Sequence, residues 1–265
     1  MSSGPAGHTA GDALRLRFLS YNMLVGMAMR HYGHYLTGAW RHALPYRGAR
    51  ANLDRIADML QGYDFVAIQE LDGGSLRTAL RNQLEYLARR AGYPHFGFAV
   101  TRDLRPFAHH GLGFLSRYKP LQIVEHALPG PIPGRGAISV SLDTSAGGLE
   151  VMVTHLSLGA GTRARQLDFL AARTPAGRHA VLIGDLNSGP EALREHEGLR
   201  QRGFWVPDAV PPTFPSWRPQ RAIDHVLLTR ELRLDRLEAV PHVMSDHLPL
   251  AADITMHRKP ATERS

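Results

Sequence analysis

The sequence predicts a single mixed α/β or α+β domain that contains more than one β-sheet. Short apolar runs with the length of buried strands recur along the chain, and amphipathic helical patterns lie between some of them. No Pro/Gly/Ser-rich linker divides the chain, and its 265 residues, 43% of them hydrophobic, are enough to bury a substantial core. Residues 1–13 and 257–265 are polar and are expected to form flexible tails, which leaves one domain over 14–256.

Eight segments have the character of buried strands. Each is a run of mostly apolar, often β-branched or aromatic residues that ends in polar or turn-forming residues. In chain order, the predicted strands are 14–22, 64–70, 111–117, 137–142, 149–156, 179–187, 222–228 and 249–256.

Three segments have helical periodicity. Residues 49–62 place an apolar stripe on one face and end at Gly62, a favourable C-cap residue type. Residues 75–92 begin at Ser75, a suitable N-cap, and also end in glycine. The third helix is expected over 162–173, beginning at its threonine.

Composition and missing motifs exclude several classes of protein. Without cysteine there is no disulfide scaffold, no Cys-ligated zinc and no thiol nucleophile. No run of about 18 apolar residues is present, so we expect no membrane span, and the start of the chain lacks the apolar region of a signal peptide, which favours a cytoplasmic location. The motifs GxSxG, HExxH and the P-loop are also missing from the sequence.

The charge balance is basic and dominated by arginine. The net charge is +7, and of the 31 Lys and Arg residues only Lys119 and Lys259 are lysines. Arginine suits bidentate contacts with phosphate, and a basic surface favours anionic partners. A codon bias toward arginine explains the same composition equally well, so charge alone decides nothing.

Polar side chains interrupt the predicted strands, several of them close to the C-terminal ends. Asp224 and His225 lie within the strand 222–228, and Asp246 and His247 lie just before the last strand. Any one of them has an ordinary explanation as a turn, cap or Asx-turn residue. Together they predict one crevice, because converging ionisable groups are costly to bury without a use. The set is Asn22, Glu70, His155, Asp185, Asn187, Asp224, His225, Asp246 and His247.

The ligand types in this set favour a hard cation. Carboxylate and amide oxygens without thiolates suit Mg²⁺, with Mn²⁺ as a possible substitute, rather than zinc. The pair His31 and His34 has a spacing that could suggest a metal site, but we interpret it as part of a loop that covers the site.

Taken in chain order, these motifs resemble the endonuclease/exonuclease/phosphatase superfamily of metal-dependent phosphohydrolases, which includes deoxyribonuclease I. The resemblance runs from Asn22 to the C-terminal SDHLP motif and covers nearly the whole globular region. Its most specific part is GDLN followed by SDHLP, whereas IQE or THL alone would be weak. The motifs, in order, are Asn22, IQE (68–70), LSR (115–117), THL (154–156), GDLN (184–187), IDH (223–225) and SDHLP (245–249).

The resemblance implies a deoxyribonuclease I-like four-layer sandwich of two packed mixed β-sheets flanked by helices. It also implies that Glu70 is the main Mg²⁺ ligand, with Asn22 beside it and Asp246 contributing. Relatives often carry an asparagine where this chain has Leu112, which puts a ligand contact at that position in doubt.

The resemblance further implies the catalytic roles. Asp185 orients or deprotonates the attacking water, and Asn187 holds the phosphate. His247 is the catalytic imidazole, Asp224 fixes its tautomer, and His155 contacts the scissile phosphate or the leaving oxygen. These roles suit phosphoryl transfer, which needs positioning and charge stabilisation more than covalent chemistry. We therefore expect direct attack by water without a covalent enzyme intermediate.

Three variable segments are candidates for substrate selection. Residues 27–47 interleave aromatic and cationic residues, as stacking and phosphate contacts require. The segments 162–165 and 211–221 contribute further cations and a tryptophan near the predicted site, although ordinary surface packing explains all three segments as well. The candidate substrate-binding residues are Arg163, Arg165, Trp217, Arg218 and Arg221.

Three functions remain open at this level. A phosphodiesterase or nuclease acting on DNA or another nucleic acid is favoured by the arginine-rich balance and predicts salt-sensitive binding. A hydrolase of a phospholipid head group or a small phosphate ester, resembling sphingomyelinases or inositol phosphatases, predicts little affinity for DNA. A non-catalytic scaffold is the third. In each case we expect a monomer.

Overall fold

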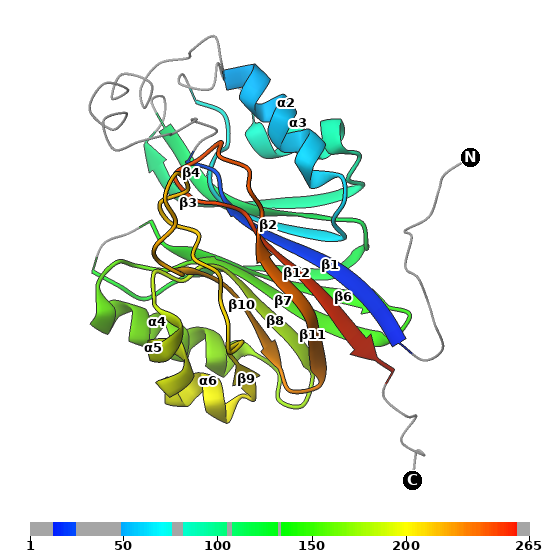
Figure 1. The fold of residues 1–265 in the computed structure, drawn as a ribbon, viewed down its shortest axis with the longest axis vertical. Coiled ribbons are helices and arrows are strands. Elements are labelled where there is room, and N and C mark those ends of the chain that lie inside the picture. The colour runs from blue at the N-terminus through cyan, green and yellow to red at the C-terminus, as the bar shows by residue number, and fades with distance from the viewer. Residues whose placement is uncertain (1–12, 25–48, 76–81, 105–107, 132–133, 259–265) are drawn as a thin grey trace.

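The protein is a four-layer α/β sandwich in which two six-stranded mixed sheets pack face to face between helices (Figure 1). This computed structural model describes residues 13–24, 49–75, 82–104, 108–131 and 134–258. The expected fold class is therefore confirmed. In spatial order, the first sheet is β11 (Leu232–Ala239), β12 (Leu250–His257), β1 (Ala13–Asn22), β2 (Phe65–Asp72), β4 (Ala108–Ser116) and β3 (His95–Leu104). The second sheet is β5 (Pro120–Ala127), β6 (Gly136–Thr144), β7 (Gly147–His155), β8 (His179–Asp185), β10 (Asp224–Thr229) and β9 (Phe204–Trp205).

Helices cover the outer face of each sheet. The first sheet carries α2 (Ala49–Leu60) and α3 (Gln83–Ala91). The second carries α4 (Ala160–Arg173), α5 (Pro190–Glu195) and α6 (Glu197–Gln201). No helix in the described ranges is long and apolar enough to cross a bilayer.

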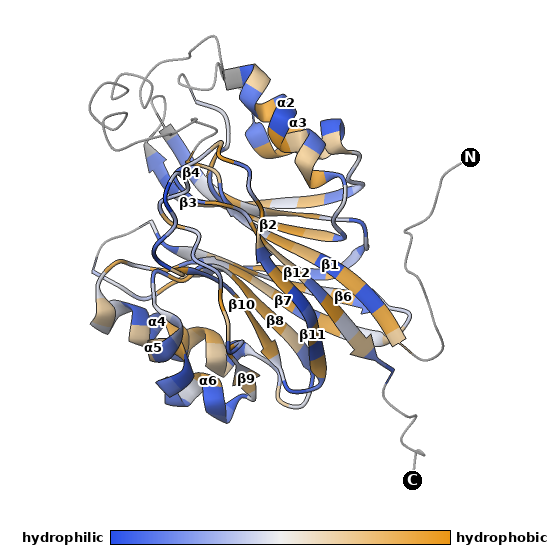
Figure 2. Cartoon of the chain, viewed as in Figure 1, coloured by the Kyte–Doolittle hydropathy of each residue, from blue (hydrophilic) through white to orange (hydrophobic). Residues whose placement is uncertain are grey.

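Burial of both sheet faces explains why the interior strands are continuous apolar runs. Along β1, Leu16 and Phe18 pack against the second sheet, whereas Leu19 and Tyr21 pack against the helices. All seven residues of β8 are buried. Hydrophobic residues accordingly concentrate along the strands of both sheets (Figure 2).

All eight predicted strands are present, with ends that differ from the predicted ends by three residues or fewer. The sequence did not predict β3, β5, β9 or β11. Each of these four strands lies at an edge of its sheet.

The three predicted helices form, but two of them begin elsewhere. Helix α3 begins at Gln83 rather than after Ser75, because the Asn82 side chain caps it by accepting the Glu85 amide at 3.2 Å. The Ser75 hydroxyl instead donates to Asp72 Oδ2 at 2.8 Å. The following residues 76–81 lie outside the described residues.

The caps of the other two helices also differ from the predicted ones. Helix α4 begins at Ala160, with Gly159 as its N-cap, two residues before the predicted threonine. Gly92 ends α3 in the left-handed conformation, as expected of a C-cap glycine, but Gly62 is not in that conformation and α2 ends at Leu60.

The two predicted domain boundaries fall at the first sheet. Ala13 and His257 pair across β1 and β12, so one residue of each predicted tail belongs to the ladder. Leu112, the residue that departs from the family pattern, is buried in the core between the sheets.

Gly184 is required by a close approach of two strands. Its φ is +148°, and a Cβ built there would lie 1.9 Å from the carbonyl oxygen of Thr154 on the neighbouring strand β7. We expect Gly184→Ala to lower the free energy of unfolding by roughly 3 kcal/mol or more, because the cost of the strained φ adds to the cost of the steric overlap with Thr154. Urea unfolding measures this loss.

The matched control is Gly148→Ala, because a Cβ at Gly148 would meet no atom within 4 Å. An equal loss of stability in both variants would refute the close-approach explanation.

Candidate active site

Two pairs of parallel strands bring the predicted polar residues to one end of the sandwich. Strands β1 and β2 run parallel, with Asn22 opposite Gln69, and β7 and β8 run parallel, with His155 opposite Asp185. The C-terminal ends of parallel neighbours meet at one edge of a sheet, where α/β proteins commonly bind ligands.

Asn22 joins the two sheets at this end. Its side-chain amide donates to Glu70 Oε1 at 3.2 Å and to Asp185 Oδ2 at 3.2 Å. Its Oδ1 accepts the Leu24 amide at 3.3 Å. Residues 163 positions apart in the sequence are therefore held in one hydrogen-bonded cluster.

A β-bulge positions Glu70. The pairing of β2 with β4 shifts register between Ile68 and Leu71, so β2 carries one extra residue there. Glu70 has a φ of +54°, a conformation that costs a non-glycine residue energy and clusters at functional sites. Bulges re-aim side chains next to active sites, and this one separates Glu70 from the regular alternation of its strand.

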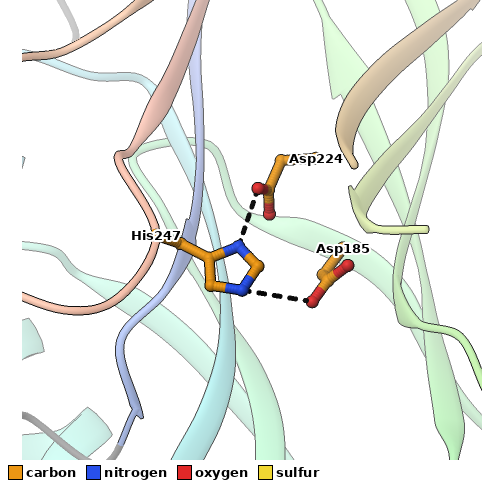
Figure 3. Close-up of side chains that lie close together, drawn as sticks. All are labelled: Asp185, Asp224 and His247. Carbon is orange, nitrogen blue, oxygen red and sulfur yellow. Dashed lines mark hydrogen bonds and ion pairs between the residues drawn. The ribbon is translucent and has the colours of Figure 1, made fainter. Parts of the chain in front are cut away.

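His247 lies between two buried carboxylates (Figure 3). Its Nδ1 is 2.8 Å from Asp224 Oδ2, and its Nε2 is 3.8 Å from Asp185 Oδ2. Burial alone would lower the pKa of His247, but the charges of Asp224 and Asp185 outweigh burial and raise the pKa to about 10. The ring is therefore an imidazolium at neutral pH, with Nδ1–H donating to Asp224.

Asp185 is a buried carboxylate with an elevated pKa. Burial and the negative charge of Asp224 raise its pKa to about 7, although His247 opposes the rise. The backbone amide of Asn187 donates to Asp185 Oδ1 at 3.0 Å. A carboxylate with a pKa near neutrality is suited to accept a proton from water.

His155 is held as a neutral ring beside Asp185. Its Nε2 is 3.3 Å from Asp185 Oδ2. Burial, followed by the charges of Arg135 and His247, keeps the pKa of His155 well below its usual value. His155 and His247 therefore carry different charges at neutral pH, which separates their chemical roles.

The loop after β8 places Asn187 in the left-handed conformation, with φ +50°. Its side-chain amide donates to the Leu156 carbonyl at 2.9 Å, so one of its N–H groups ties this loop to the end of β7. His225, the neighbour of Asp224, is buried in β10, and its Nε2 is 2.8 Å from the Ser188 carbonyl of the same loop.

Two hydroxyl residues that were not among the predicted site residues support the site. The Ser245 hydroxyl lies 2.7 Å from the Asn22 carbonyl and accepts the His247 amide at 3.4 Å. The Thr213 hydroxyl donates to Asp224 Oδ2, the oxygen that also binds His247. Ser245 directly precedes the Asp246–His247 pair, so its position was a usable signal, whereas Thr213 had none.

The donor set fits a hard divalent cation. Burial, followed by the negative charge of Asp246, raises the pKa of Glu70, so two carboxylates of like charge lie within electrostatic range of one another. A bound cation would relieve this repulsion, and carboxylate and amide oxygens are the ligands that Mg²⁺ prefers. In the described part of the chain, Asp185, Asp224 and His247 also form a group with ligand atoms within 4.8 Å, but His247 and Asp224 bind each other within that group.

Arg163 lies close to the site but is engaged in holding a loop. Its Nε donates to Ser188 Oγ at 3.1 Å, and its Nη1 donates to the Leu158 carbonyl. Arg165 is exposed and bonds to Thr162 of its own turn at 3.4 Å. Of these two predicted substrate contacts, Arg163 alone is tied to the loop that carries Asn187 and Ser188.

The segment 211–221 approaches the site through Phe214. The centre of the Phe214 ring lies 5.0 Å from that of the His247 ring. The guanidinium carbon of the exposed Arg221 lies 5.8 Å from the centre of the same Phe214 ring. Trp217 is half-buried and Arg218 is exposed. Residues 27–47, including His31 and His34, lie outside the described residues.

Arg135 is a further residue that the sequence did not predict. It precedes β6 and borders a cavity of about 270 Å³ together with Glu70 and His155. Burial lowers the pKa of Arg135 and the charges of Glu70 and Asp185 oppose this, so Arg135 lies within electrostatic range of the site. A lone arginine between two glycines carries no sequence signal of this placement.

Comparisons with known proteins agree with this architecture. A family model described as the Endonuclease/Exonuclease/phosphatase family matches residues 19–247. A comparison with curated proteins finds no match.

Solved structures with the same fold include an endonuclease/exonuclease/phosphatase from Beutenbergia cavernae DSM 12333. It has 22% identity, a TM-score of 0.72, and an alignment covering 94% of this chain and 73% of that one. Humanized D. rerio TDP2 has 18% identity, a TM-score of 0.63, and coverages of 91% and 98%. Sphingomyelinase C from Streptomyces griseocarneus has 19% identity, a TM-score of 0.63, and coverages of 90% and 99%.

The fold, the strand-end site and the family match define a hydrolytic phosphoesterase. The chain belongs to the endonuclease/exonuclease/phosphatase family, whose members are typically metal-dependent. An enzymatic role therefore replaces the scaffold alternative.

Proposed function

We propose that the protein is a Mg²⁺-dependent phosphodiesterase that hydrolyses P–O ester bonds of DNA or another nucleic acid, with Mn²⁺ as a substitute. The observation that carries the proposal is the position of His247, whose Nδ1 binds Asp224 and whose Nε2 lies 3.8 Å from Asp185 Oδ2. This arrangement combines a cationic donor with a carboxylate base, the two groups that water attack on a phosphate ester requires.

In this proposal, Asp185 orients the attacking water and takes its proton. The His247 imidazolium donates a hydrogen bond to a phosphoryl oxygen, and Asp224 keeps its Nδ1 protonated. The neutral ring of His155 contacts the scissile phosphate or the leaving oxygen. Asn187 holds the phosphate through its second N–H, since the first binds Leu156.

Glu70, Asn22 and Asp246 would hold the cation. When bound, it supplies positive charge that offsets the charge developing on the phosphoryl and leaving oxygens. Asn22 orients Glu70 through its side-chain hydrogen bond, and Ser245 anchors Asn22 through its backbone carbonyl.

The basic net charge of +7 supports a polyanionic substrate. The exposed arginines Arg165, Arg218 and Arg221 are candidate contacts to the substrate backbone. Binding that weakens steeply with salt would accompany such contacts.

A second candidate function is hydrolysis of a phospholipid head group or a small phosphate ester. Leu158 favours it, because this side chain is 75% exposed three residues after His155. An exposed apolar side chain beside the site would suit a lipid surface.

A metal-dependent hydrolysis panel tests the proposal. It contains plasmid DNA, single-stranded and abasic oligonucleotides, bis-p-nitrophenyl phosphate, sphingomyelin vesicles and inositol phosphates. We expect nucleic acid to be cleaved with Mg²⁺ or Mn²⁺, and cleavage to be lost with EDTA or in Glu70→Ala, because the main metal ligand is gone.

The exposed Glu231 provides a matched control, and Glu231→Ala should retain activity. Cleavage confined to sphingomyelin or inositol phosphates would refute the nucleic-acid assignment and support the second candidate. Inversion at a chiral phosphorothioate supports direct water attack, whereas retention would contradict it.

A further inference from the structure

The cavity beside the catalytic residues has a cationic wall that the catalytic roles do not use. Glu70 and His155 border it on the catalytic side, and Arg102, His110 and Arg135 line it as well. Glu70 is the one carboxylate among its described lining residues, and it already belongs to the proposed cation site. The cavity therefore presents positive charge to whatever enters it from the site.

The Arg135 side chain is half-buried and has no direct polar contact in the described part of the chain, although the charges of Glu70 and Asp185 reach it. Its guanidinium forms no hydrogen bond or ion pair with those residues, and burial lowers its pKa although Glu70 and Asp185 oppose this. A charged group that loses hydration without gaining a hydrogen bond is costly. A bound anion would offset this desolvation free energy, and the planar guanidinium can donate two parallel hydrogen bonds to phosphate oxygens.

Arg102 stands next to Arg135 on the same wall. A Cβ built at Gly134 would lie 3.4 Å from Arg102 Cβ and 3.5 Å from its Cδ, so the stem of Arg102 packs against the residue that precedes Arg135. Arg102 comes from the edge strand β3, where it is exposed and opposite His110 in the register. Two guanidinium groups thus come from segments more than 30 residues apart.

A further cavity adjoins the first one. A second cavity of about 440 Å³ shares Thr101, Gly134, Arg135 and Gly136 with the first. Arg135 therefore lies where the two meet. We call these two adjoining cavities the arginine groove, of which the second part is also lined by Glu125 and His126. A substrate phosphate at His247 would leave this groove open to the next part of the same molecule.

We propose that the arginine groove is a subsite for a second phosphate of the substrate, bound by Arg135 and Arg102 while the scissile phosphate lies at Asp185 and His247. In a nucleic acid this second group is the neighbouring backbone phosphate. The inference rests on the proposed phosphodiesterase function and adds to it a requirement for at least two phosphates.

The test compares substrates with one and two phosphates. The single-phosphate substrates are thymidine 3′-(4-nitrophenyl phosphate) and thymidine 5′-(4-nitrophenyl phosphate). Each is compared with the matched two-phosphate substrate, which carries an additional phosphate on the other hydroxyl of the sugar. We expect kcat/KM with Mg²⁺ to rise tenfold or more with the second phosphate in one of the two polarities, which corresponds to about 1.4 kcal/mol.

Arg102→Gln and Arg135→Gln should each lower this ratio toward one, because the second phosphate loses a cationic partner. The matched control is Arg230→Gln, an exposed arginine between β10 and β11, which should keep the wild-type ratio. A wild-type ratio near one in both polarities would overturn the proposal, as would a ratio that both groove variants retain.

Binding to the metal-free protein separates this inference from the proposed function. Calorimetry in EDTA should show at least tenfold tighter binding of thymidine 3′,5′-bisphosphate than of either monophosphate, and Arg102→Gln should remove the difference. If no ester is hydrolysed but this preference holds, the phosphodiesterase proposal fails and the subsite stands. Equal binding of the mono- and bisphosphates would overturn the subsite. Tighter binding of inositol 1,4-bisphosphate than of the nucleotide would support the subsite and assign it to a phosphorylated polyol.

Discussion

Asp185→Asn is expected to lower kcat by about 10²–10⁴-fold, the contribution typical of a general base. An amide keeps the size of the side chain but cannot take the proton of the attacking water. Because Glu70 and Asp246 carry the proposed cation site, Mn²⁺ affinity should change little. Single-turnover kinetics and Mn²⁺ titration measure the two quantities.

The pH profile gives a second readout of Asp185. Its folded-state pKa is raised to about 7, so the carboxylate form grows as pH rises through that value. Activity should therefore increase with pH up to about 7, and bound Mg²⁺ should move this acidic limb lower, since positive charge favours the carboxylate. Asp185→Asn should remove the limb.

Asp143→Asn is the control for this variant, because Asp143 is exposed in the β6–β7 hairpin at a distance from the site. Wild-type turnover in Asp185→Asn would show that this residue is not the base. A persistent acidic limb would assign that limb to another group.

His247→Ala is expected to raise the activation barrier by about 3 kcal/mol, as does the loss of a preorganised donor to developing negative charge. The pKa of His247 is raised to about 10, so its imidazolium form is present below that pH and is lost above it. Wild-type activity should accordingly decline as pH approaches 10. The variant should lose this alkaline limb along with about a hundredfold in kcat.

His247→Ala also leaves Asp224 buried without its imidazolium, so stability must be measured beside activity. Thermal unfolding shows whether the variant is folded at the assay temperature, and the exposed His257→Ala serves as control. A folded His247→Ala protein with wild-type kcat would contradict the assigned role. A His247→Gln variant retains a neutral hydrogen-bond donor, so its kcat should lie between those of the wild type and His247→Ala.

The strands that could be predicted from sequence are those with both faces covered. The eight predicted strands occupy every interior position of the two sheets, where packing on both sides demands continuous apolar runs. The four edge strands have no such pattern. Most residues of β5 are exposed, and β11 is interrupted by a register shift between Leu234 and Arg236.

Helix ends were less predictable than helices, because caps depend on local competition. Ser75 has the chemistry of an N-cap, but its hydroxyl binds Asp72, and Asn82 performs the capping seven residues later. Propensity identified residues able to cap, and the surrounding structure selected among them.

The site follows a similar division. The motifs around Glu70, Asp185 and His247 indicated which chemical groups would meet, because a buried strand has no packing reason to be flanked by a carboxylate or an imidazole. Thr213 and Arg135 carry no such signal. Their importance comes from neighbours that only the fold brings close, Asp224 for Thr213 and Glu70 for Arg135.

The sequence alone therefore determined the interior strands, the superfamily resemblance and the chemical types of the site residues, since burial and motif spacing leave local patterns. Only the tertiary structure decided which strand ends meet and how their groups are protonated. The pKa of Asp185 lies near 7 because burial and the charge of Asp224 raise it. The pKa of His247 lies near 10 because the charges of Asp224 and Asp185 outweigh burial, which lowers it. These electrostatic effects depend on distances between atoms, which a linear sequence does not contain.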